Sequence, residues 1–155
     1  MTDRQIDLLM RDFGVAIGAP DMALDEQDFL AITTDEGFVV NLDYFEDDKA
    51  LVVYTTAGDI PEEHRFDLYE EMLKANLFWN TTAGATLCID PEGESALVTA
   101  HIAEATLDAP MLVTFVTNIC RVAAMWNARL RELVEDLETT DDAPEPGPGD
   151  AAQFA

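Results

Sequence analysis

Residues that could do chemistry are few in this sequence, and no familiar motif brings them together. Two histidines, His64 and His101, are the only imidazole bases available to activate a nucleophile. The single serine, Ser95, lacks the G-x-S-x-G surroundings of a hydrolase nucleophile. A solvated or hydrogen-bonded structural role is more common for such histidines. The sequence therefore predicts no catalytic residue, although an unrecognised enzyme remains an alternative.

Metal-binding and nucleotide-binding patterns are equally scarce. Cys88 and Cys120 form no C-x-x-C pair, and neither histidine belongs to an H-E-x-x-H motif. The acidic runs DEQD, DYFEDD and TTDDAPE lack the alternating oxygen ligands, central glycine and closing glutamate of an EF-hand. The sequence contains no Walker A loop and no G-x-G-x-x-G fingerprint. We therefore expect no metal and no cofactor.

The charge balance narrows the possible partners. Eight Lys and Arg residues face 32 Asp and Glu residues, which gives a net charge of −24. Nucleic acids and anionic lipid surfaces reward basic groups, so neither is an expected partner. Two interpretations of the acidity stay open: it serves general solubility, or it keeps an exposed apolar surface from self-association. With 48% hydrophobic residues the chain can still build a core.

Three features favour a cytoplasmic protein. The two widely spaced cysteines are typical of free thiols in a reducing compartment, rather than of a disulfide framework. Asp3 and Asp7 interrupt the N-terminal stretch where a signal peptide needs a basic start and an apolar run. We also find no run of about 18 apolar residues, the length that a membrane-spanning helix needs.

Apolar spacing predicts the first half of the fold. Residues 3–17 form a helix with one apolar stripe, from which Leu8 and Val15 point away. Strands follow at 29–34, 38–43 and 50–56, the first two joined by an Asp-Glu-Gly turn and the third covered on both faces. A second helix follows within 58–78, capped by Asp59. Its main apolar line is Phe66, Tyr69, Leu73 and Leu77.

The second half contains a hairpin and a long helix. Strands at 85–89 and 95–102 are joined by Asp90-Pro91-Glu92-Gly93, a type I turn sequence. A third helix runs over 109–137, with Asp108 as its cap and Pro110 in its first turn. We interpret 1–137 as one α+β domain of order α-β-β-β-α-β-β-α, a mostly antiparallel sheet covered by helices. The acidic, Pro/Gly-rich residues 138–155 are predicted to be a disordered tail.

The junction ANLFWNTTAGATLCIDPEG, residues 75–93, places Phe78 and Trp79 beside a polar bend. Aromatic side chains are favoured as buried anchors of protein–protein interfaces. They also close the cores of single domains, so both interpretations of this pair stay open.

The same region carries a resemblance to a known family. The helix LYEEMLKANL at 68–77, the Gly-containing bend, the strand ATLCI at 85–89 and the turn DPEG at 90–93 resemble class I type III secretion chaperones, the Tir-chaperone or CesT-like family. The element order, small size and acidity match as well, so the resemblance covers about residues 3–137. It implies a cytoplasmic homodimer that binds the N-terminal segment of a secretion effector and keeps it extended and secretion-competent, without ATP.

Two sets of site residues follow from this resemblance. It implies a dimer interface around the second helix and the next strand: Leu73, Leu77, Phe78, Trp79, Thr86 and Cys88. It implies cargo-binding patches on the first helix and first strands: Leu8, Leu9, Met10, Phe13, Phe29, Phe38, Val40, Leu51 and Val53. For any one of the cargo positions, a place in the domain's own core is the competing interpretation. The competing function is a regulatory or protein-interaction domain of the same fold with no secretion partner.

Overall fold

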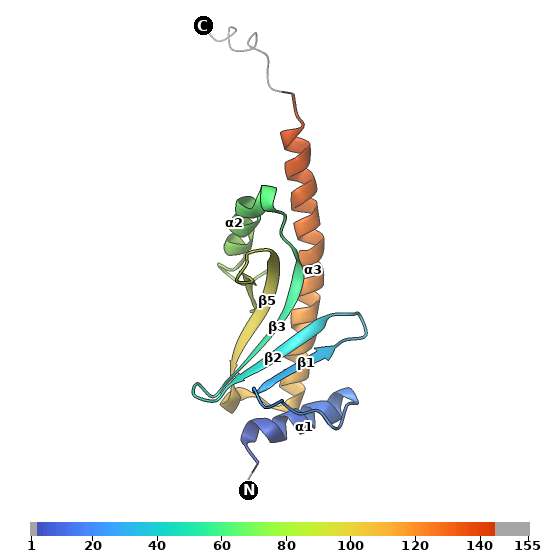
Figure 1. Ribbon diagram of the computed structural model, residues 1–155, viewed down its shortest axis with the longest axis vertical. Coiled ribbons are helices and arrows are strands. Elements are labelled where there is room, and N and C mark those ends of the chain that lie inside the picture. The colour runs from blue at the N-terminus through green and yellow to red at the C-terminus, as the bar shows by residue number, and fades with distance from the viewer. Residues whose placement is uncertain (1–2, 145–155) are drawn as a thin grey trace.

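The computed structural model describes residues 3–144, which form one five-stranded antiparallel sheet and three α-helices (Figure 1). The sheet order is β1-β2-β3-β5-β4, so β1 and β4 are its two edges. The α+β class and the predicted order of helices and strands are confirmed, with two short 3₁₀ turns added. The elements are α1 (Gln5–Ile17), β1 (Phe29–Thr33), β2 (Val39–Phe45), β3 (Ala50–Asp59), a 3₁₀ turn (Glu62–His64), α2 (Arg65–Ala75), β4 (Thr86–Ile89), β5 (Ser95–Ala103), a 3₁₀ turn (Glu104–Thr106) and α3 (Ala109–Asp141).

One face of the sheet carries the core. The buried side chains of β2 and β3 alternate along each strand, and cross-strand pairs such as Leu42 with Val53 lie on the same side. Leu9, Phe13 and the buried stripe of α3 complete this core. On the opposite face Val52 and Tyr54 are only half-buried, so the prediction that β3 is covered on both faces is wrong. β3 is central within the sheet, but its second face stays partly open.

Both predicted hairpins form, each with its own turn chemistry. In the β1–β2 turn the Gly37 N–H donates to the Thr34 carbonyl at 2.9 Å, and Gly37 has a φ of 89°. In the β4–β5 turn the Gly93 N–H donates to the Asp90 carbonyl at 3.0 Å, as a type I turn requires. The Asp90 carboxylate also accepts from the Glu94 and Ser95 N–H groups. These hydrogen bonds, with that of Ser95 contributing most, lower the pKa of Asp90.

The second helix differs from the prediction in its start and in its buried face. Asp59 ends β3 instead of capping a helix, and α2 begins only at Arg65, after the 3₁₀ turn. The side chains buried in the core are Leu68 and Met72. The predicted line of Phe66, Tyr69, Leu73 and Leu77 lies on the other side, where all but the half-buried Tyr69 are exposed. A short helix with two apolar faces can bury only one of them in its own domain.

The third helix, α3, is the longest element of the domain. Asp108 caps it, its carboxylate accepting from the Met111 N–H at 2.8 Å, and Pro110 lies in the first turn as predicted. Its 33 residues span about 50 Å, and in Figure 1 its C-terminal turns extend beyond the sheet. The helix is long and apolar enough to cross a membrane by composition, but Leu112, Ile119 and Trp126 pack into the core. It is therefore the core helix of this domain.

The end of α3 corrects the predicted domain boundary. The helix continues to Asp141, so residues 138–141 are helical and not part of a disordered tail. Residues 145–155 lie outside the described part of the chain, and the prediction of disorder for them stays a prediction.

Candidate protein-binding surfaces

Burial divides the nine predicted cargo positions into two groups. Leu9, Met10, Phe13, Val40, Leu51 and Val53 are buried in the core. Side chains already packed inside the domain offer no surface to a partner, so their assignment to a cargo patch does not hold in this structure. The reason is that the stripe of α1 and the inward positions of β2 and β3 belong to one core cluster with the buried residues of α3. Leu8 is 47% exposed, while Phe29 and Phe38 are half-buried and so remain accessible.

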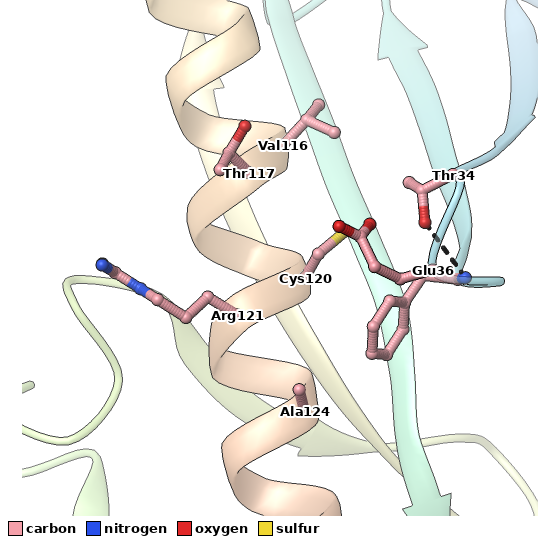
Figure 2. Close-up of a pocket in the computed structure, with 8 residues that line it drawn as sticks. Thr34, Glu36, Val116, Thr117, Cys120, Arg121 and Ala124 are labelled. Carbon is pink, nitrogen blue, oxygen red and sulfur yellow. Dashed lines mark hydrogen bonds between the residues drawn. The ribbon is translucent and has the colours of Figure 1, made fainter.

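Two adjoining cavities form an apolar groove along β1, which we call the edge groove. The larger one, about 510 Å³, lies between the end of α1, β1 and α3, with Ile17, Met22 and Ile32 among its lining residues. The smaller one, about 330 Å³, lies between the β1–β2 turn and α3, with Phe38 and Cys120 among its lining residues (Figure 2). Both share Thr34, Glu36, Val116 and Thr117, so they are parts of one continuous surface.

The backbone of β1 next to this groove has unpaired edge positions. Asp28 O accepts from Tyr44 N at 2.9 Å, and Thr34 N donates to Phe38 O at 2.9 Å. Because the hydrogen bonds of a strand alternate, the backbone groups of Ala31 and Thr33 point away from β2. The backbone groups of Phe29 also point away from β2, but Asp25 already binds both of them. The Asp25 N–H donates to the Phe29 carbonyl, and the Asp25 carboxylate accepts from the Phe29 N–H. The open part of this edge is therefore Ala31 and Thr33.

The other edge strand is partly closed by α2. Asp90 N donates to Ser95 O, so the outward-facing backbone groups of β4 belong to Leu87 and Ile89. The Asn76 side chain, at the end of α2, donates to the Leu87 carbonyl at 3.0 Å and accepts from the Leu87 N–H at 2.9 Å. A side-chain amide thus occupies the place that another strand would take. The two edges differ: β1 has two residues, Ala31 and Thr33, open for strand addition, whereas β4 has Ile89 alone.

The predicted interface residues form a second surface on the outer side of α2 and the bend after it, which we call the seam surface. Leu73 is 69% exposed, Phe78 is 76% exposed and Trp79 is 52% exposed. Thr86 is also exposed and Cys88 is half-buried. Phe66, Leu77 and Ile89 add to the exposed apolar side chains of these elements. Phe78 and Trp79 therefore do not close the core of the domain.

The backbone holds Trp79 in an unusual conformation. Its φ is 52°, in the left-handed region that a bulky side chain rarely adopts. Such a conformation costs about 1–2 kcal/mol for a residue other than glycine. The Trp79 carbonyl accepts from the Thr82 N–H at 3.3 Å in the bend, while the residue stays 52% exposed. Trp79 is therefore a candidate for a contact outside the monomer.

Hydrogen bonds fix α2, and with it the seam surface, to the β4–β5 hairpin. In addition to the Asn76–Leu87 pair, the Tyr69 hydroxyl donates to the Gly93 carbonyl at 2.7 Å. A side chain at position 93 would meet the Tyr69 hydroxyl 2.5 Å from its Cβ, so this close approach needs glycine. α2 and the hairpin therefore present their outer residues as one unit.

Neither thiol has the environment of a reactive cysteine. Both are free, and burial raises the pKa of each, with the charge of Glu36 adding to the effect at Cys120.

Within residues 3–144 no group of three or more His, Cys, Asp or Glu side chains is arranged to hold a metal ion. Ser95 and His101 stand six residues apart on the extended strand β5, about 20 Å from each other, and so form no catalytic pair. His64, at the end of the first 3₁₀ turn, is buried.

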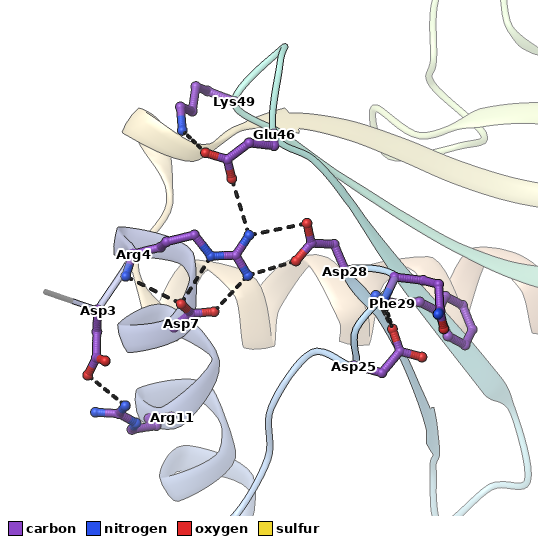
Figure 3. Close-up of polar contacts among 10 residues, drawn as sticks. Asp3, Arg4, Asp7, Arg11, Asp25, Asp28, Phe29, Glu46 and Lys49 are labelled. Carbon is purple, nitrogen blue, oxygen red and sulfur yellow. Dashed lines mark hydrogen bonds and ion pairs between the residues drawn. The ribbon is translucent and has the colours of Figure 1, made fainter. Parts of the chain in front are cut away.

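An ion cluster joins α1 to the sheet near the start of β1 (Figure 3). The Arg4 guanidinium donates to Asp28 at 2.7 Å, to Asp7 at 3.0 Å and to Glu46 at 3.2 Å. It also lies 5.8 Å from the centre of the Tyr44 ring. The hydrogen bond from Arg4 lowers the pKa of Asp7. This cluster sets the position of α1, whose C-terminal end forms one wall of the edge groove.

A domain with an open sheet edge beside an apolar groove, and with a separate exposed aromatic surface, is a protein-binding domain. Residues 8–127 match the Tir chaperone protein (CesT) family. This match spans most of the chain, so the chain belongs to that family, and the resemblance found from the sequence is confirmed. A search of curated protein sequences finds no match.

Solved structures share the fold at low sequence identity. A chain of the ExsC–ExsE complex aligns with a TM-score of 0.70 at 19% identity, covering 81% of this chain and 93% of that one. A chain of the HopA1–SchA chaperone–effector complex gives 0.67 at 16% identity, with 80% and 94% covered. A chain of the Yersinia pestis type III secretion chaperone SycH in complex with a stable fragment of YscM2 gives 0.62 at 20% identity, with 77% and 98% covered.

Proposed function

We propose that this chain is a cytoplasmic chaperone that binds the N-terminal chaperone-binding segment of a type III secretion effector. The partner segment stays extended and secretion-competent while bound, and the chaperone needs neither ATP nor catalysis. Membership of the CesT family supports the partner class, and the solved chaperone–effector and chaperone–fragment complexes of the same fold support the mode of action.

The observation that carries this proposal is the open edge of β1 beside the edge groove. Ala31 and Thr33 offer two N–H and two C=O groups to an added strand, which is the hydrogen-bonding pattern of an extended peptide. The groove next to them accepts the apolar side chains of that strand. Of the nine predicted cargo positions, Leu8, Phe29 and Phe38 keep this role in the proposal. Binding an unfolded segment in this way needs only complementary surface and a soluble carrier, and the charge of −24 supplies solubility.

We further propose that the chaperone acts as a homodimer joined through the seam surface. The exposed Leu73, Leu77, Phe78 and Trp79 offer the aromatic and aliphatic anchors that stable interfaces use. Thr86 and Cys88 extend this surface onto β4, whose edge Asn76 already closes at Leu87. The seam surface and the edge groove involve opposite edge strands of the sheet, so one can form a dimer while the other stays open.

The test begins with the partner that co-purifies from the native host, identified by mass spectrometry. Its N-terminal segment is then produced alone and titrated into the full-length chain without nucleotide, while amide hydrogen exchange is followed by NMR. We expect slower exchange at Ala31 and Thr33 and little change at Leu87, which Asn76 already protects. Protection confined to other regions, or a partner that stays folded in the complex, would contradict the proposed binding mode. A partner that is not a secreted protein would favour the interaction domain without a secretion role.

A further inference from the structure

The smaller cavity of the edge groove, which we call the Cys120 pocket, combines an apolar interior with a carboxylate at its mouth. Phe38 lines it from the sheet side, and Val116, Cys120 and Ala124 line it from α3. In Figure 2 the Glu36 carboxylate extends from the β1–β2 turn toward the Cys120 sulfur. Its volume of about 330 Å³ is at the lower end of the range of ligand sites, which suits one large side chain.

Glu36 has no basic partner among residues 3–144. Arg121 lines the same pocket, but in Figure 2 its guanidinium points away from Glu36, and it donates to Asn118 at 2.9 Å. Asp35, next in the chain, lines the adjoining cavity and adds a second negative charge to the groove. In a chain with 32 acidic and 8 basic residues, Glu36 forms no ion pair within residues 3–144, and a cationic side chain of a partner would complement it.

We propose that the Cys120 pocket binds an arginine or lysine side chain of the cargo segment, and that Glu36 is the residue that selects it. Only these side chains combine a long aliphatic stem, which fits between Phe38 and Val116, with a cationic end that meets Glu36. This inference rests on the proposed function, because the pocket lies at the hairpin end of the β1 edge. A strand added at Ala31 and Thr33 runs past Thr34, which lines both cavities.

The proposal is tested by selecting a displayed library of random 15-residue segments on three full-length proteins in parallel. These are the wild type, Glu36→Gln, and Glu138→Gln as a control that removes the same charge from an exposed site on α3. We expect the wild type and the control to enrich segments with Arg or Lys at a fixed position among apolar residues. Glu36→Gln should keep the apolar preference and lose the basic one. Since Glu36 is exposed on a turn, the variant should fold normally.

One enriched segment is then used for a double-mutant cycle. Replacing its basic residue by Gln should weaken binding to the wild type about fivefold, with no further loss in Glu36→Gln. The same basic preference in all three selections would overturn the role of Glu36 while leaving the proposed function intact. If the wild type enriches no segment at all, binding of extended segments fails, and this inference fails with it.

Discussion

Asn76 and Leu87 are joined by two hydrogen bonds. The side-chain amide of Asn76, at the end of α2, donates to the outward-facing carbonyl of Leu87 on β4 and accepts from its N–H. This pair places α2 beside the edge of the sheet and closes that edge at Leu87. We expect Asn76→Ala to lower the free energy of unfolding by about 2 kcal/mol, because it leaves both backbone groups of Leu87 without these partners. Chemical denaturation measures the loss. Asn80→Ala, at an exposed position in the following bend, is the control and should have little effect.

The open edge of β1 is tested by Thr33→Pro. The Thr33 N–H points away from β2, so proline removes no hydrogen bond of the sheet but blocks strand addition at that residue. We expect binding of the cargo segment to fall by tenfold or more in calorimetry, while the fold stays intact by circular dichroism. Thr33→Val, which keeps the N–H, should bind nearly as well as the wild type. If the proline variant binds equally well, strand addition does not take place at this edge.

Local signals predicted most of the elements because they depend on residues close in sequence. The Asp108 cap reaches an N–H three residues away, and the Asp90–Gly93 turn closes within four residues. Such cap and turn hydrogen bonds form in the same way in any fold, so the sequence predicts them without knowledge of which other elements pack nearby. The helical residues after Leu137 were missed for a related reason. They are exposed, and the acidic, Pro/Gly-rich composition of residues 138–155 as a whole predicts disorder.

Burial of α2 could not be predicted in the same way. The helix has apolar residues on two sides, and spacing alone does not say whether Leu68 or Leu73 faces the core. That choice depends on the Asn76–Leu87 and Tyr69–Gly93 contacts, which join residues 11 and 24 positions apart. The edge groove was harder still to predict from local sequence, because its walls come from four separate segments: α1, β1, the β1–β2 turn and α3. The sequence therefore predicted the kinds of surface but not which of the nine predicted cargo-binding positions of this chain lie on them.

Trp79 is the sharpest test of the seam surface. Light scattering on the full-length chain should give about twice the 17.1 kDa chain mass at micromolar concentration. Trp79→Ala should weaken dimerisation by about 2 kcal/mol or more, because central aromatic side chains dominate interface energetics. The dissociation constant is measured by sedimentation. Val15→Ala changes another exposed apolar residue, on α1, and should leave the dimer unaffected. A monomeric wild type would contradict the homodimer.

The Arg4 cluster predicts a stability contribution that depends on pH. Since Arg4 lowers the pKa of Asp7 in the folded state, this pair stabilises the fold above the unfolded pKa of 3.8, and the contribution is lost as the pH falls through the lower folded value. The difference in unfolding free energy between the wild type and Arg4→Ala should therefore be largest near neutral pH and shrink below about pH 4. Denaturation at pH 7 and pH 3.5 measures it. Arg11→Ala, which breaks a single exposed pair with Asp3, should show a smaller difference at both values.

The C-terminal turn of α3 carries charges of the unfavourable sign. Glu138 and Asp141 lie where the helix dipole favours cations, and the last turn contains no basic residue. A chain that ends at Leu137 should therefore melt within about 2 °C of one that ends at Pro144, because the segment removed is exposed and its charges oppose the dipole. Ending the chain at Val134 instead removes the half-buried Leu137, which lines a cavity with Leu68, and should lower the melting temperature clearly. Calorimetry on the three truncations separates these effects. A large loss on ending the chain at Leu137 would show that residues 138–144 pack against something, and the effective boundary of the domain would then lie beyond Asp141.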